Sequence, residues 1–300
     1  MTQEQRELID RVLGTCPMLA RSSWYPIHKP GDDTDSGHST KFGGNKPFRP
    51  DNFLWPICDE CNAHKAFVCQ INIATLPPLL QEHIKMSSGL FQLFYCLECM
   101  PLNCFKDVTI IKSSQLVPSL QSLAANKAVR LKSYNPKKLP PTLRNFVQDY
   151  TEKVPLHEVF GDELEENVVE GWNMIRAELP NTQEYRDIES LAEEIKSKAD
   201  LSEEQFDTFV DLLSDEPDTA LEAHAGVTSA GSGVKLGGWI RWCQGVEYPE
   251  CPECPGVTMD ITFLQMEEDE VYEFGWGDCG TGHVTLCPQC GRPGLQWACG

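Results

Sequence analysis

Short runs of large apolar and β-branched residues, bounded by Gly and Pro clusters, recur along the chain and predict β-strands. Towards the start, three such runs cover Phe67–Ile71, Leu90–Tyr95 and Asp107–Lys112. Towards the end, two more cover Ile261–Met266 and Gly282–Cys287. The surrounding Gly and Pro residues predict turns. Both ends of the chain are therefore expected to be rich in strands.

In the region between these ends, apolar residues recur with the spacing of amphipathic helices. One helix is predicted over Leu201–Asp215, where Ser202 and Gln205 have the spacing of a capping box. Its buried face is expected to hold four residues: Phe206, Phe209, Val210 and Leu213. Another helix is predicted over Glu184–Ala199, and its buried stripe is Ile188, Leu191 and Ile195. The charged start of the chain, residues 1–14, is also helical in pattern.

One motif occurs twice, as Lys41-Phe42-Gly43-Gly44 and as Lys235-Leu236-Gly237-Gly238, 194 positions apart. Each copy is followed by the same ordered landmarks: an aromatic residue with Pro, a Cys-x-x-Cys pair, a strand containing Gln, another strand and a second Cys-x-x-Cys pair. This order predicts a duplicated β-rich unit in which each Gly pair makes a tight turn.

The expected fold class is α+β, with an internally duplicated β-rich unit, four-cysteine zinc knuckles and an acidic helical insert between the copies. The predicted parts are an N-terminal helix (1–14), a first copy (15–112), a mixed segment with acidic helices (113–230) and a second copy (231–300). Together they are expected to form one domain over roughly residues 15–300.

Eight of the fourteen cysteines form four Cys-x-x-Cys pairs: Cys58/Cys61, Cys96/Cys99, Cys251/Cys254 and Cys287/Cys290. Two residues between thiolates let both sulfurs of a tight turn reach one metal, and a second pair completes a tetrahedral site. The pairs are separated by 34 residues in the first half and 32 in the second. We predict two structural zinc ions, with one ion or none as the alternatives.

Two other residues are alternative ligands at the first site, namely His64 and Cys104. Cys69 lies in an apolar run and is expected to be a small buried residue. A thioredoxin-like redox role requires a single pair after a strand of a βαβ unit, so four pairs in two matched sets argue against it.

The net charge of −20 is concentrated in the middle of the chain, where residues 151–222 hold 5 Lys and Arg against 22 Asp and Glu. This charge excludes nucleic acid as an expected partner. Solvated helix faces are the favoured interpretation of the acidic residues, and a docking surface for a basic protein is the alternative. The one locally basic run, Lys127–Arg144, is interpreted as a solvated loop.

The chain has no secretory signal pattern, no uninterrupted apolar stretch of membrane-spanning length and no lipidation motif. We therefore expect a protein of the cytoplasm, or of both the cytoplasm and the nucleus, with no membrane partner. In a reducing compartment the cysteines are not expected to form disulfides.

The search for catalytic patterns gives one weak candidate, the loop Trp276–His283, which brings Asp278, Cys279 and His283 close in sequence. A Cys–His pair could act as a nucleophile, but the many Gly residues favour a tight turn. P-loop, Gly-x-Ser-x-Gly and dinucleotide-binding motifs are missing from the sequence.

The landmarks Lys41–Gly44, Trp55-Pro56-x-Cys58-x-x-Cys61, Gly89–Phe94 and Trp276-Gly277-Asp278-x-Gly280 resemble the YwqG-like family, a domain of unknown function. This resemblance spans roughly residues 15–300 and implies a single α+β domain with an internal duplication, without an established activity or catalytic residues. The cysteine sets go beyond the family's minimal pattern. The layout is also similar, more distantly, to the programmed cell death protein 2 type, which is linked to the chaperoning of ribosomal proteins.

Taken together, these features predict a zinc-stabilised cytosolic protein-interaction or adaptor domain with a protein partner, which the acidic surface suggests is basic. Two alternatives stay open. One is an enzyme with a cleft site at the Trp276–His283 loop. The other is an immunity or antitoxin-like protein that binds a basic partner through its acidic surface.

Overall fold

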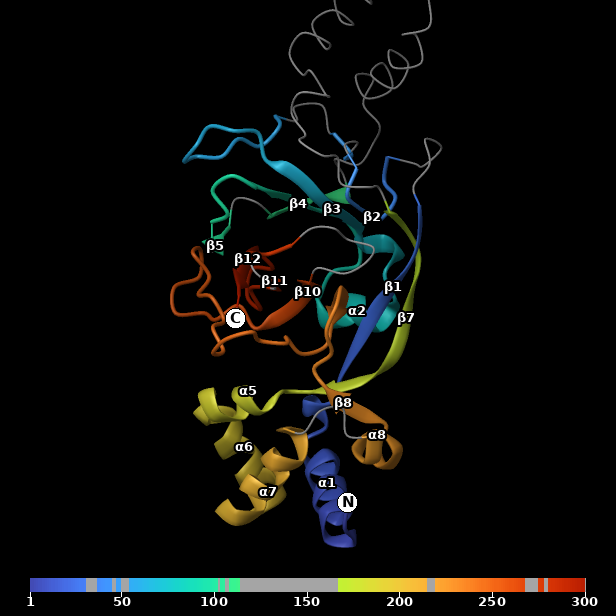
Figure 1. Ribbon diagram of the computed structural model, residues 1–300, viewed down its shortest axis with the longest axis vertical. Coiled ribbons are helices and arrows are strands. Elements are labelled where there is room, and N and C mark those ends of the chain that lie inside the picture. Colours follow the sequence, from blue (N-terminus) through green and yellow to red (C-terminus); the bar gives the residue numbers. More distant parts are fainter. Residues whose placement is uncertain are drawn as a thin grey trace, which may run out of the picture.

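The structure is a computed structural model, and it describes residues 1–30, 37–44, 47–49, 54–101, 103–105, 108–113, 167–214, 219–267, 275–277 and 280–299. Its main feature is one sheet of twelve strands that curves until its two ends approach each other (Figure 1). The strands are β1 (Arg21–Pro30), β2 (Lys41–Phe42), β3 (Ala66–Asn72), β4 (Leu90–Tyr95), β5 (Asn103–Cys104), β6 (Val108–Ile111), β7 (Asn167–Leu179), β8 (Val227–Ser229), β9 (Lys235–Gly237), β10 (Ile261–Glu267), β11 (Thr281–Leu286) and β12 (Pro293–Ala298).

The order of strands across the sheet is β5-β12-β11-β10-β9-β1-β7-β2-β3-β4-β6. Strand β8 lies off this path and pairs in parallel with β7, whereas every pair along the path is antiparallel. The long strands β1 and β7 pair with each other at the centre of the order. Strands β5 and β6 lie at opposite ends of the order, yet only three residues separate them in the chain. The two ends of the sheet must therefore lie close together, so the sheet is nearly closed.

The helices are α1 (Gln3–Thr15), α2 (Pro78–His83), α5 (Thr182–Asp187), α6 (Glu189–Ala199), α7 (Glu203–Ser214) and α8 (Thr219–Ala225), with 3₁₀ turns at Pro17–Leu19 and Ile73–Thr75. All but α2 gather at one end of the sheet, beside the N-terminus (Figure 1). Among the described residues, no helix combines the length and the apolar character needed to cross a membrane.

Two large hydrophobic cores contain most of the buried apolar side chains that the structure describes. The larger core fills the curve of the sheet, and its members include Trp24, Phe91, Phe263 and Trp276, with Leu80 contributed by α2. The smaller core joins the helices of the far end. It contains Ile9 of α1, Ile195 of α6 and Phe209 of α7, all fully buried. The helical end is therefore a packed layer rather than a set of solvated helices.

The predicted strand positions agree closely with the observed ones. Strand β4 has the bounds expected from the sequence, and β3, β10 and β11 differ from the expected runs by one residue at one or both ends. Helix α7 begins with the expected capping box, in which the N–H of Gln205 donates to Ser202 Oγ and the N–H of Ser202 donates to Gln205 Oε1. The predicted apolar face of this helix is buried.

The prediction of one helix over Glu184–Ala199 is wrong, because the chain breaks at Ile188 into α5 and α6. Ile188 has φ −105° and ψ 81°, which are not helical. The preceding residue, Asp187, accepts a 3.1 Å hydrogen bond from the N–H of Val246, which holds the end of α5 in place. As a result, Ile195 is buried, whereas Ile188 and Leu191 are only half-buried.

Candidate metal centres

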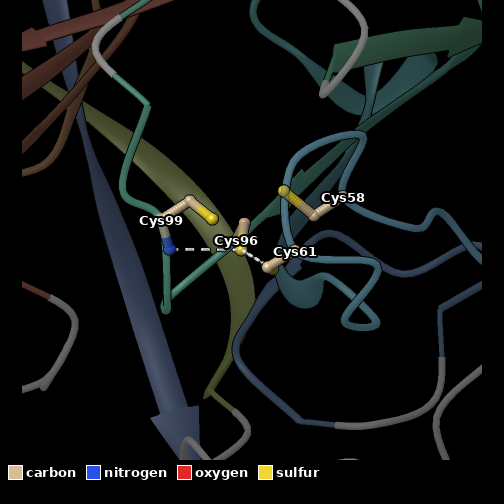
Figure 2. A group of neighbouring side chains, drawn as sticks. All are labelled: Cys58, Cys61, Cys96 and Cys99. Carbon is tan, nitrogen blue, oxygen red and sulfur yellow. Dashed lines mark hydrogen bonds between the residues drawn. The ribbon is translucent and has the colours of Figure 1, made fainter.

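The first four-cysteine cluster is assembled from two loops at the same edge of the sheet. Cys58 and Cys61 lie between β2 and β3, and Cys96 and Cys99 directly follow β4. All four sulfurs lie within 4.8 Å of one another, and Cys61 Sγ is 3.6 Å from Cys96 Sγ (Figure 2). In a tetrahedron with metal–sulfur bonds of about 2.3 Å, the sulfurs are about 3.8 Å apart. The cluster therefore has the size that a tetrahedral metal ion needs.

Local backbone geometry explains why these loops bring the thiols together. The N–H of Asn62 donates to the carbonyl of Cys58 at 3.0 Å, and Asn62 has the left-handed φ of 60° expected for this position. In the second loop, the N–H of Cys99 donates to Cys96 Sγ at 3.4 Å (Figure 2). Met100 takes the left-handed position there, with φ 44°. Each loop is thus a tight turn closed on its own first cysteine.

The second cluster repeats this arrangement in the other half of the sheet. Cys251 and Cys254 lie between β9 and β10, and Cys287 and Cys290 lie between β11 and β12. Their sulfurs also fall within 4.8 Å of one another, and Cys251 Sγ is 3.6 Å from Cys290 Sγ. Gly291, with φ 71°, has the left-handed conformation that its position after the second cysteine predicts.

The structure brings together all eight cysteines that the sequence singled out, in the two expected groups of four. His64, the alternative ligand, is exposed and belongs to neither group. The side chain of Cys104 lies outside the described residues. Every cysteine whose side chain the structure describes is a free thiol, and Cys69 is fully buried, as expected.

One thiol in each cluster is prepared to lose its proton. Hydrogen bonds from the backbone of Cys61 and Glu60 lower the pKa of Cys58 to about 7. Burial raises the pKa of Cys287, but backbone hydrogen bonds, including that from Cys290, outweigh it and bring the value down to about 7. Because the thiolate is the form that binds metal, these two residues are ready ligands near neutral pH.

Two further thiols, Cys96 and Cys254, favour the protonated form unless a cation is bound. Burial raises the pKa of Cys254 to about 12, and it also raises the pKa of Cys96. A divalent ion would supply the positive charge that the four clustered sulfurs lack. The donor set therefore fits a metal ion that prefers sulfur ligands and tetrahedral geometry.

A buried ion pair explains the second Lys-x-Gly-Gly motif. Lys235 Nζ donates to Glu178 Oε2 at 2.5 Å and to the carbonyl of Trp239 at 2.7 Å. Glu178 also accepts the N–H of Trp239 at 3.1 Å. The intervening Gly237 and Gly238 have φ of 66° and 69°, so the chain turns back over the carboxylate. Sequence reasoning identified the turn but missed Glu178, which lies 57 residues away.

One buried glutamine in each half of the sheet holds the neighbouring loops by hydrogen bonds. Gln70 Nε2 donates to the carbonyls of Gly37 and Ser39, and Gln70 Oε1 accepts the N–H of Phe48 at 2.7 Å. In strand β10, Gln265 Nε2 donates in the same way to the carbonyls of Gly231 and Gly233, and its Oε1 accepts the N–H of Arg241 at 2.8 Å.

These glutamine contacts are equivalent by position. In both halves the two carbonyls lie four and two residues before the motif lysine. The lysine is in turn the register partner of the glutamine, Lys41 with Gln70 and Lys235 with Gln265. The recurrence of a Gln in the strand after each motif was the sequence signal for these residues.

The weak catalytic candidate is only partly described. Asp278 and Cys279 lie outside the described residues. His283 is on β11 with 1% of its surface exposed, and its ring packs against Trp242 with centroids 5.0 Å apart. Burial lowers the pKa of His283 to about 3, so this imidazole is neutral at physiological pH.

A third polar cluster lies where the helical end meets the sheet. Glu184 of α5 accepts hydrogen bonds from Tyr248 Oη at 2.8 Å and from Trp242 Nε1 at 3.2 Å. Its side chain is fully buried, and burial raises its pKa to about 7. This carboxyl ties the helices to the segment that precedes the second cysteine cluster.

Residues 40–289 match the family model described as "Domain of unknown function (DUF1963)". Comparison with curated proteins finds no matching sequence. The matched region includes both cysteine clusters apart from Cys290.

Proposed function

Because the chain belongs to the DUF1963 family, a domain of unknown function, its role has to be argued from its own residues, and we propose that it is a zinc-stabilised protein-interaction domain. The single observation that supports this proposal best is the convergence of eight thiols into two groups of four. Four thiolates complete a tetrahedral zinc site and leave no open position for water or substrate. Such a site stabilises the fold instead of activating a reactant.

The free energy of zinc binding is large enough for this role. Structural zinc sites supply about 10–16 kcal/mol of apparent binding free energy, comparable to the whole stability of a domain. Each cluster joins the two loops at one end of a hairpin, β3–β4 or β10–β11, so metal would hold the start of the first strand to the end of the second.

Metal content and cluster variants test the zinc proposal. We expect elemental analysis of the full chain to give two zinc ions, and the variants Cys58→Ser/Cys61→Ser and Cys251→Ser/Cys254→Ser to retain one each. Cys299→Ser, which removes a half-buried thiol outside both groups, is the matched control and keeps two. Folded protein without metal, or a melting curve that a chelator leaves unchanged, would contradict the proposal.

We further propose that the two halves arose by duplication. The equivalent glutamine contacts, the equivalent cluster positions and the equivalent strand orders support this. One half runs β2-β3-β4-β6 and the other β9-β10-β11-β12, each with the same antiparallel pairing. The long strand that comes before each motif pairs with the opposite half, β1 with β9 and β7 with β2. Duplication therefore comes with an exchange of the first strand.

A non-catalytic role follows from the closed clusters and from the burial of His283, which leaves the Trp276–His283 loop poorly suited to nucleophilic chemistry. We propose a protein partner of basic character, since the net charge is −20. Affinity capture with zinc-loaded protein should retain a polypeptide. Retention of small metabolites alone would favour the enzyme alternative, whereas an unchanged cellular phenotype on combined replacement of Cys279 and His283 would exclude it.

We also propose the YwqG-like family as the finer assignment and the cytosol as the compartment. The assignment is supported by the match to a domain of unknown function over the region that carries the resemblance. The compartment is supported by the free thiols, which a reducing environment preserves.

A further inference from the structure

The two loops that carry the first cysteine cluster also carry three exposed apolar side chains. Leu54 is 87% exposed, and Ile57 and Leu97 are each 50% exposed. We call these three residues the apolar rim. Scattered exposed apolar residues are normal on protein surfaces, but several at one site mark an interaction surface. The position of the rim relative to the cluster is therefore informative.

The cluster holds two of the three rim residues in place. Ile57 directly precedes Cys58, and Leu97 directly follows Cys96, so these two residues are covalently bonded to cysteines whose sulfurs lie within 4.8 Å of one another. Ile57 also pairs with His64 in an isolated antiparallel bridge across the first loop. A rim on two metal-joined turns would lose little conformational entropy when a partner binds.

The second cluster has a similar arrangement of loops, but its surface is polar at the position equivalent to Ile57. The position equivalent to Ile57 is Glu250, which makes the matching bridge to Thr258 and is exposed. Its two loops are joined by an ion pair between Arg292 and Glu253. Because stability alone is served by either surface, the apolar residues at the first cluster need a separate explanation.

Charge identifies the kind of occupant. The same two loops carry three acidic residues, Asp59, Glu60 and Glu98, and all are exposed. Four thiolates around one divalent ion would add a net charge of about −2. A second copy of this chain, with a net charge of −20, would be repelled.

We propose that the apolar rim and its acidic neighbours bind a polypeptide segment that carries large apolar side chains next to Lys or Arg. The apolar side chains would contact Leu54, Ile57 and Leu97, and the cations would pair with Glu60 and Glu98. This inference rests on the proposed protein-interaction function and specifies where the partner binds.

Peptide selection tests it with the full, zinc-loaded chain. A phage-displayed library of random twelve-residue peptides is selected on the wild-type protein, and enriched sequences are synthesised with a fluorophore for anisotropy titration. We expect enrichment of Lys or Arg beside Leu, Ile or Phe. The rim variant Leu54→Ser/Ile57→Ser/Leu97→Ser should weaken binding about tenfold or more.

Two matched controls separate the rim from general effects. Ile27→Ser/Leu79→Ser/Met174→Ser removes three other exposed apolar side chains, and should leave affinity within about twofold. Glu60→Lys/Glu98→Lys should weaken binding and its dependence on salt, whereas Glu204→Lys/Asp207→Lys, with the same change in net charge on α7, should not.

The outcomes separate this inference from the proposed function. Enriched peptides that bind the rim variant as tightly as wild type overturn the inference but support a protein-interaction role elsewhere. Enrichment of acidic or uncharged peptides overturns the proposal that the bound segment carries Lys or Arg. Failure to enrich any peptide counts against both proposals. A wild-type dimer in sedimentation experiments that the rim variant abolishes shows that a second copy is the occupant and also overturns the inference.

Discussion

Lys235 and Glu178 form an ion pair with a nitrogen–oxygen distance of 2.5 Å, and their side chains are 0% and 1% exposed. The pair joins β9 to the end of β7. Removing one partner of such a pair leaves the other charge buried without compensation. The pair is therefore a point at which the fold should be sensitive to single substitutions.

Lys235→Met is expected to lower the free energy of unfolding by about 3–5 kcal/mol, since it strands the Glu178 carboxylate. Urea denaturation followed by tryptophan fluorescence measures the change. Lys198→Met is the control, because its pair with Glu194 is exposed and should matter little. Equal stability of the two variants would mean that the buried pair contributes nothing to the fold.

Gly238→Ala is expected to be far more damaging than Gly256→Ala. Both residues have left-handed φ, 69° and 74°, so each substitution carries a backbone penalty of about 1–2 kcal/mol. A Cβ at Gly238 would also collide with Glu178 Oε2 and lie 2.8 Å from Ser23 Cβ, whereas one at Gly256 meets nothing within 4 Å. Thermal melts of the two variants make the comparison, and similar melting temperatures would contradict the predicted collision.

Glu184 should make stability fall as pH rises. Burial raises its folded-state pKa from 4.5 to about 7, so the folded protein binds more protons than the unfolded chain between these values. The contribution of this group is present below pH 4.5 and is lost by about pH 7, a change of about 3 kcal/mol.

The measurement for Glu184 is the difference in unfolding free energy between wild type and Glu184→Gln from pH 5 to pH 8. Both proteins keep the cysteine clusters, so any loss of metal in acid cancels. As pH rises, the unfolding free energy of the wild type should fall relative to that of Glu184→Gln. A difference that is constant with pH would show that Glu184 is ionised throughout.

Gln70→Leu and Gln265→Leu should destabilise the protein to a similar extent. Each removes the partner of one buried N–H and of two carbonyls, and leaving a buried polar group unsatisfied costs about 1–3 kcal/mol. Gln81→Leu, which removes one hydrogen bond from a half-buried side chain to the carbonyl of Ile73, is the milder control. A large cost at only one of the two glutamines would argue against equivalent halves.

The cysteine clusters could be predicted because their geometry is local. Two residues between thiols define a tight turn, and the left-handed residue that follows was evident at Asn62 and Gly291. Met100 has the same conformation without any sequence signal, since its side chain disfavours it and only the closed turn imposes it. The pattern of apolar residues was sufficient to predict strands β3, β4, β10 and β11.

Features that depend on distant residues could not be predicted. Strands β1 and β7 are interrupted by Pro and charged residues, and they are strands because they pair with each other and with both halves. The break at Ile188 depends on a contact with residue 246. The apolar rim is apparent only when exposure is known, because Ile57 and Leu97 have the same chemistry as core residues.

The exchange of β1 and β7 between halves has a consequence for biosynthesis. As the chain leaves the ribosome, β2 acquires its second neighbour only after residues 167–179 emerge, and β1 must wait for residues 235–237. Strand β5 has no partner until residues 293–298 are made. The unpaired edges of the nascent chain would invite mispairing during translation, so folding should be largely post-translational and dependent on chaperones that shield them.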